Sequence, residues 1–360
     1  MTSWKTYRLG DVCSRLRSGK GIPASEVSTC GKFAVVGGNG VRGYTDTSNF
    51  NGQCVVVGRQ GAYCGNVRYF DGEFYMTEHA VVIVGNELAD THFLAYLLST
   101  MHLGQLSAQS AQPGLSVQTL SKLEISLPSL EEQRRIAGIL GTIDDKIENN
   151  RRINTNLELQ AQALYKQWFV DSSIVKLGDV VKTTSGGTPS RSHMEFYVGK
   201  YGWVKSKELN SSFITKTEET ITDDAIAKSA AKLLPAKSIL IAMYGATVGQ
   251  YAILSQPMTC NQAVCALLPN ENYPYTYLFM VAKNIKEELA NKAIGSAQQN
   301  ISQVIIKDID ISSDIEKIKQ FHTIVCPHFE VMEKNQKENE TLAILRDTLL
   351  PKLMNGEIKV

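Results

Sequence analysis

The sequence predicts an α+β protein in which two tandem globular α+β domains are separated by two long helices that pair as an antiparallel coiled coil. Three observations support this: an internal repeat, two heptad-like segments, and short β-branched runs bounded by glycine, asparagine and proline. We expect the first domain at residues 1–128, the first helix at 129–171, the second domain at 172–312 and the second helix at 313–360.

The chain repeats itself at an offset of 168 to 186 residues. Three pairs of matching segments occur in the same order: Leu9–Val12 with Leu177–Val180, Gly52–Gly65 with Ala236–Gly249, and Ser110–Gln112 with Ser296–Gln298. Each pair is a weak match by itself. Because all three keep one order and nearly one offset, they indicate a tandem duplication.

Each half ends in a charged segment whose apolar positions alternate by four and three, the a/d pattern of a coiled coil. The seam predicted in the first helix consists of Ile136, Leu140, Ile143, Ile147, Asn150, Asn154, Leu157 and Leu164. The seam predicted in the second, less regular helix includes Phe321, Val325, Met332, Asn335, Asn339, Leu342 and Leu349. The alternative is two amphipathic helices that lie on separate cores.

Two asparagines stand near the middle of each seam. A polar residue at a seam position costs stability and specifies register and orientation. In an antiparallel pair the two midpoints meet, so Asn150 and Asn154 are expected to face Asn335 and Asn339.

Local signals predict where the helices begin. Ser129 with Glu132, and Ser313 with Glu316, have the spacing of capping boxes. Pro327 falls inside the second heptad segment, which predicts that this helix kinks or restarts there.

Composition excludes several classes of protein. The chain has 37 Lys and Arg against 36 Asp and Glu, a net charge of +1, so bulk charge alone does not hold it on a nucleic acid. The seven cysteines include no CxxC pair, which argues against a disulfide framework or a zinc knuckle and favours a reducing compartment. No apolar run is long enough to span a bilayer, and Met1–Lys5 lacks the apolar region of a secretory signal. We therefore expect a cytoplasmic protein.

The sequence lacks the common catalytic motifs. It contains no GxxxxGK[ST], HExxH or GxSxG pattern, and its six histidines are dispersed. The glycines of Gly37–Gly40 are better explained by a tight turn than by a dinucleotide-binding motif. Asp144–Lys146 is similar to the end of a nuclease motif, but its place on the heptad helix favours a solvated charged face. We expect no catalytic residue and no metal site in this chain.

The whole arrangement resembles the specificity subunits of type I restriction-modification enzymes. Leu127–Ile136 is similar to the Leu-Pro-x-x-x-x-Gln-x-x-Ile opening of that family's helix, and Ile143–Ile147 continues the likeness. Turn segments that look like those of the family are Gly58–Gly65, Ser185–Ser190, Ile241–Gly249 and Asn261–Gln262. The second helix departs from the pattern, because it opens with Ser313–Glu316 and lacks the proline and glutamine.

The resemblance implies a non-catalytic subunit that binds double-stranded DNA. Residues 1–128 and 172–312 would be target-recognition domains that each read one half of a bipartite site, and the helices at 129–171 and 313–360 would set the spacer. The helices would also dock two methyltransferase subunits, which carry S-adenosylmethionine, so this chain would need no cofactor. Motor-nuclease restriction subunits would join for cleavage.

Candidate base readers are polar side chains expected on exposed turns, where Arg and Lys suit guanine and Asn and Gln suit adenine. The candidates in the first domain are Asn39, Arg42, Tyr44, Arg59, Gln60 and Tyr63. The candidates in the second domain are Thr188, Arg191, Lys205, Lys207, Tyr244 and Gln298. Two other functions compete with this one: a duplicated coiled-coil scaffold that binds protein or carbohydrate, and a self-contained modification enzyme, which would need a cofactor motif.

Overall fold

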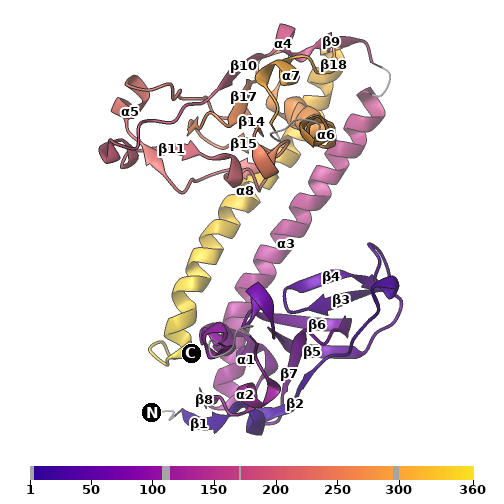
Figure 1. The fold of residues 1–360 in the computed structure, drawn as a ribbon, viewed down its shortest axis with the longest axis vertical. Helices are drawn as coiled ribbons and strands as arrows, with labels where there is room; N and C mark the ends of the chain where they lie inside the picture. The colour runs from indigo at the N-terminus through magenta and orange to yellow at the C-terminus, as the bar shows by residue number, and fades with distance from the viewer. Residues whose placement is uncertain (1–3, 108–113, 170–171, 295–299) are drawn as a thin grey trace. The chain divides into compact units, whose positions relative to one another are not determined.

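The computed structural model describes residues 4–107, 114–169, 172–294 and 300–360 (Figure 1). The chain divides into two compact units: the first unit contains Met1–Lys146 and Thr341–Val360, and the second unit contains Ile147–Glu340. Each long helix contributes to both units. The repeat pair Ser110–Gln112 and Ser296–Gln298, together with candidate Gln298, lies outside the described residues.

A six-stranded sheet forms the body of the first unit, in the order β2-β7-β5-β6-β3-β4. Neighbouring strands are antiparallel except β3 and β6, which are parallel. The strands are β2 (Cys13–Ser18), β3 (Phe33–Gly37), β4 (Gly40–Thr45), β5 (Phe50–Gly58), β6 (Val67–Met76) and β7 (Ala80–Gly85).

Side chains of β5 alternate between two small cores. Val55 and Val57 face α1 (Thr91–Ser99) and share a core with its Phe93, whereas Cys54 and Val56 belong to a second cluster. This alternation is the two-residue period of a strand that is buried on both faces. Helix α1 begins at a capped turn, because the Asp90 carboxylate accepts the Phe93 N–H at 2.9 Å.

A short ribbon connects this unit to the first long helix. Strand β1 (Lys5–Arg8) pairs antiparallel with β8 (Glu124–Leu127), and α2 (Val117–Ser121) precedes β8. Helix α3 (Leu130–Phe169) follows, and the Ser129 hydroxyl accepts the Glu132 N–H at 3.3 Å. The buried Gln133 amide donates to the carbonyls of Leu88 and Pro128, both at 3.0 Å, and accepts the Asp90 N–H. This glutamine therefore joins the helix start to the loop before α1.

The second unit contains a five-stranded sheet in the order β10-β17-β14-β15-β12 and a three-stranded sheet in the order β13-β11-β16. The strands are β10 (Lys182–Ser185), β11 (Tyr201–Val204), β12 (Phe213–Ile214), β13 (Thr220–Ile221), β14 (Ile239–Ala242), β15 (Tyr251–Leu254), β16 (Thr259–Cys260) and β17 (Val264–Leu268). The helices are α4 (Leu177–Val180), α5 (Asp223–Ala227), α6 (Tyr275–Ile294), α7 (Gln303–Lys307) and α8 (Ile315–Met354).

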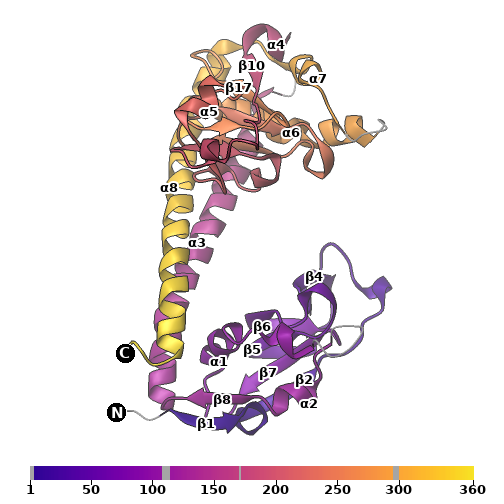
Figure 2. The same cartoon turned by 60° about the vertical axis from the view of Figure 1, so that its left-hand side comes forward.

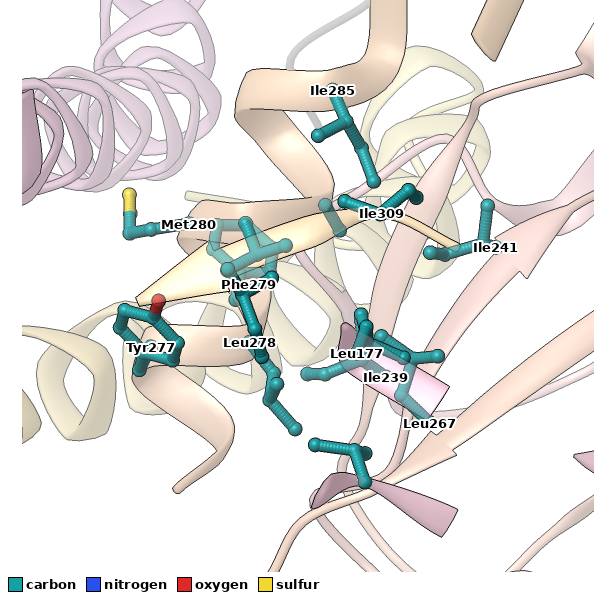
Figure 3. Close-up of a cluster of buried hydrophobic side chains, with 14 of the residues drawn as sticks. Leu177, Ile239, Ile241, Leu267, Tyr277, Leu278, Phe279, Met280, Ile285 and Ile309 are labelled. Atoms are coloured by element: carbon teal, nitrogen blue, oxygen red, sulfur yellow. The ribbon is translucent and has the colours of Figure 1, made fainter. Parts of the chain in front are cut away.

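Helix α6 supplies many of the buried side chains in the core of the second unit. Figure 3 shows Tyr277, Leu278 and Phe279 on this helix and Ile239 and Leu267 on the sheet, all in one buried cluster. These side chains are at most 1% exposed. The Tyr277 hydroxyl also accepts the Ser312 N–H at 2.8 Å, which links α6 to the strand that precedes α8.

The two units repeat one topology, as the sequence predicts. The four-strand order β2-β7-β5-β6 of the first unit recurs as β10-β17-β14-β15 in the second. Each long helix follows a two-stranded antiparallel ribbon: β1 with β8 before α3, and β9 (Ile174–Lys176) with β18 (Asp310–Ser312) before α8. Strands β11, β13 and β16, which form the separate three-stranded sheet, are confined to the second unit.

Helices α3 and α8 lie side by side in Figures 1 and 2 and pair antiparallel. The Asn150 amide donates to Asn339 Oδ1 at 2.9 Å, and the Asn335 amide donates to Asn154 Oδ1 at 2.8 Å. These contacts confirm the prediction that the asparagines of the first helix face those of the second. Of the predicted seam residues, Ile136, Leu140, Ile147, Phe321, Val325 and Met332 are buried, whereas Ile143, Leu157, Leu164, Leu342 and Leu349 are half-buried.

The structure corrects three expectations about the long helices. Helix α8 passes through Pro327 as one helix and does not restart there, and the exposed position of Pro327 leaves its turn open to water. Asp314, not Ser313, caps α8, because its carboxylate accepts the Lys317 N–H at 3.0 Å. Asp144 is not merely solvated: it accepts the Tyr96 hydroxyl at 2.5 Å and pairs with Arg346 at 2.7 Å.

Candidate nucleic-acid interface

A glycine turn follows β5 in the first unit. The Gly65 N–H donates to the Gly58 carbonyl at 2.9 Å, and the Cys64 N–H donates to the Gly61 carbonyl at 3.1 Å. The Arg59 carbonyl accepts the Leu115 N–H at 2.8 Å. Together these bonds close the turn and present residues 60–63 outward, where Gln60 and Tyr63 are exposed.

The second unit repeats this turn bond for bond after β14. The Gly249 N–H donates to the Ala242 carbonyl at 3.0 Å, and the Val248 N–H donates to the Gly245 carbonyl at 3.1 Å. The Met243 carbonyl accepts the Ile301 N–H at 2.9 Å, the counterpart of the Leu115 bond. The structure thus places Tyr244, 42% exposed, where the first unit has Gln60.

Glycine is required at these turns for conformation and for space. Gly61 and Gly245 have φ of +68° and +67°, in the left-handed region that disfavours side chains. Gly65 has φ of +83°, and a Cβ there would lie 2.1 Å from the Gly104 nitrogen. The turn therefore packs directly on the segment after α1, and its shape is set before any ligand arrives.

A recess of about 620 Å³ opens beside the first glycine turn. Two predicted readers, Asn39 and Tyr63, line it. Arg68, His102 and Gln105 also line it, and sequence reasoning missed all three. Arg68 lies on strand β6, whereas base readers are expected on turns, and nothing in the local sequence marks His102 or Gln105.

The remaining predicted readers of the first unit lie elsewhere. Arg42 and Tyr44 are exposed on β4 and do not line the recess. Arg59 is partly buried, and its guanidinium donates to Ser18 Oγ at 2.9 Å and to the Leu115 and Glu78 carbonyls, both at 3.3 Å. The geometry gives Arg59 a structural role, because it braces the glycine turn from inside.

Basic candidates of the second unit gather around two glutamates. Lys205 contacts Glu219 at 2.7 Å and Glu218 at 3.4 Å, Lys207 contacts Glu218 at 2.7 Å, and Arg191 contacts Glu219 at 2.8 Å. The Lys205 ammonium, as a hydrogen-bond donor, lowers the pKa of Glu219, and Glu219 in return raises the pKa of Lys205. These cations are therefore largely neutralised within the protein.

Aromatic rings and short polar contacts hold the rest of this surface. The Arg191 guanidinium lies 3.9 Å from the ring centre of Tyr197 and 5.2 Å from that of Trp203. Thr188 donates a hydrogen bond to Gln262. Among the described residues, no group of three or more His, Cys, Asp or Glu is placed to hold a metal ion. No helix in the described ranges has the length and apolar character needed to cross a membrane.

Comparisons with known proteins agree with this duplicated fold. The family described as type I restriction modification DNA specificity domain matches residues 1–159 and 170–313. The specificity subunit of the type I restriction enzyme MjaIX from Methanocaldococcus jannaschii is 28% identical over 75% of this chain and 69% of its own. The HindI specificity subunit from Haemophilus influenzae is 26% identical over 82% of this chain and 84% of its own.

A solved structure shares the fold. The S subunit of a type I restriction-modification system from M. genitalium superimposes with a TM-score of 0.70 at 18% identity, covering 98% of this chain and 96% of that one. The chain belongs to the family of type I restriction-modification DNA specificity subunits, and it carries two tandem specificity domains. Family membership disfavours the alternative of a scaffold for protein or carbohydrate.

Proposed function

We propose that this chain is the non-catalytic DNA-recognition subunit of a type I restriction-modification complex, and that each unit reads one half of a bipartite duplex site. The observation that carries the proposal is the glycine turn, formed twice with the same hydrogen bonds and each time with exposed polar or aromatic side chains. A duplicated presenting element suits a target made of two separate half-sites.

The long helices would set the distance between the half-sites and dock two methyltransferase subunits. S-adenosylmethionine would reside on those subunits and not on this chain, and motor-nuclease subunits would join for cleavage. A net charge of +1 fits such an assembly, because phosphate neutralisation can be shared among subunits while this chain supplies contacts to bases. Action on host DNA would require the chain to be in the cytoplasm.

The test is to express the chain with its methyltransferase subunits in a host without adenine methylation and to sequence the methylated sites. Tyr63→Ala should relax only one half of the recognised site, and Tyr244→Ala only the other half. Lys5→Ala, on the exposed face of β1, is the control and should leave both halves unchanged. Relaxation of both halves by one substitution, or a complex that methylates no defined sequence, would contradict the proposal.

A further inference from the structure

The recess beside the first glycine turn contains an arginine without an internal partner. Arg68 is exposed on β6, and its side chain forms neither an ion pair nor a hydrogen bond with other residues in the described ranges. Its guanidinium lies against the β3–β4 turn, because a Cβ on Gly40 would be 3.4 Å from Arg68 Nε. The basic candidates of the second unit, in contrast, are paired with glutamates.

Close glycine contacts fix the walls of this recess. A Cβ on Gly38 would lie 2.9 Å from the Gly58 Cα, and a Cβ on Gly65 would lie 2.1 Å from the Gly104 nitrogen. The turn that carries Asn39, the glycine turn that carries Tyr63 and the segment that carries Gln105 therefore pack backbone to backbone. Such a site is preorganised, and binding would require little ordering of the chain.

The chemistry of the lining favours a base over a phosphate, because amide side chains accompany the arginine. Arg68, Asn39 and Gln105 are the side-chain types that bind base edges with two hydrogen bonds, arginine to guanine and the two amides to adenine. The recess has no lysine among its lining residues. We propose that Arg68 is a specificity-determining residue that reads a guanine in the half-site of the first domain, with Asn39 and Gln105 beside it at neighbouring bases. This proposal rests on the proposed function.

The repeat explains why the second domain would read a different sequence. In the first unit Val56 pairs with Arg68 across β5 and β6, and at the equivalent register Leu240 pairs with Ala252 across β14 and β15. Ala252 is fully buried and cannot contact DNA. The guanine contact therefore belongs to one half-site alone.

Two substitutions separate base reading from phosphate binding. Arg68→Ala removes both the charge and the two-pronged donor, whereas Arg68→Lys keeps the charge and removes the two-pronged donor. Each variant would be assembled with the methyltransferase subunits, and the methylated motif and the salt dependence of duplex binding would be measured. Arg8→Ala, an exposed arginine on the β1 ribbon, is the matched control.

Both Arg68 variants should lose roughly 10- to 100-fold discrimination at a single guanine-containing base pair of one half-site, and the other half should stay intact. Arg68→Lys should also keep the salt dependence of the wild-type complex. Wild-type discrimination in both Arg68 variants, or an equal loss of binding on all sequences in Arg68→Ala that Arg68→Lys restores, would overturn the proposal in favour of a phosphate contact. A wild-type complex without sequence-specific methylation would instead refute the proposed function itself.

Discussion

Single glycines set the shape of the two glycine turns, which follow β5 and β14. At Gly65 both the positive φ and the close contact with Gly104 oppose a side chain: the backbone conformation would be strained, and a Cβ would overlap Gly104. At Gly61 the positive φ acts alone, because a Cβ there would meet nothing within 4 Å. The two positions therefore separate backbone strain from steric exclusion.

Gly65→Ala should lower the free energy of unfolding by about 2 kcal/mol or more, because strain and overlap with backbone atoms combine. Gly61→Ala should cost about 1 kcal/mol, the strain of the left-handed conformation alone. Chemical denaturation of the two variants beside the wild type measures the difference. Equal losses would show that Gly104 gives way and that the turn is not held against it.

His92 should make the first unit sensitive to acid. Its ring stacks between Tyr69, at 4.1 Å, and Tyr96, at 4.9 Å. Burial lowers its pKa below the ordinary value of 6.5, and the nearby carboxylates of Asp90 and Asp144 oppose this without cancelling it. Since the unfolded chain takes up the proton at the higher pH, stability is full above pH 6.5 and is lost as the pH falls through the folded-state pKa.

His92→Phe should therefore lose less stability between pH 8 and pH 5 than the wild type does, although it can be less stable at pH 8. Thermal denaturation over this pH range measures both profiles. Parallel profiles for the two proteins would rule out His92 as a source of the acid sensitivity.

Two pairs of asparagines join the long helices α3 and α8 at the middle of their seam. Asn154 and Asn335 satisfy each other, and the Asn154 amide also donates to the Met332 carbonyl at 3.0 Å. Asn150 donates to Glu338 and Asn339, but its own oxygen is buried without a hydrogen-bond partner among the described residues. The two asparagines thus differ in how much stability they supply.

Asn154→Leu should cost about 1–3 kcal/mol, because the buried Asn335 amide loses its acceptor. Asn150→Leu should change stability by less than about 1 kcal/mol, because it removes an unpaired oxygen and leaves half-buried partners that water can reach. It should instead disturb helix register or DNA specificity. Denaturation and the methylated motif test the pair, and a larger stability loss for Asn150→Leu would contradict this reading.

The architecture of the whole molecule could be predicted from the sequence, whereas the candidate site could be predicted only in part. Repeats and heptads persist over many residues, so the duplicated domains and the facing asparagines could be predicted. The recess could not, because it joins three segments through close glycine contacts that no local pattern encodes. Arg59 lies in a turn and is therefore expected to be a reader, yet its guanidinium forms internal hydrogen bonds, whereas Arg68 lies in a strand, where no reader is expected.

The proposed role of the helices α3 and α8 is to set the distance between the two half-sites of the DNA. Seven residues inserted in α3 after Lys146 and seven in α8 after Glu340, where the units divide, would keep the antiparallel register. Each insertion adds about 10 Å of helix, which corresponds to about three base pairs. Sequencing of the methylated sites should show both half-sites unchanged and a spacer longer by about that number. An unchanged spacer, or altered half-sites, would contradict the account.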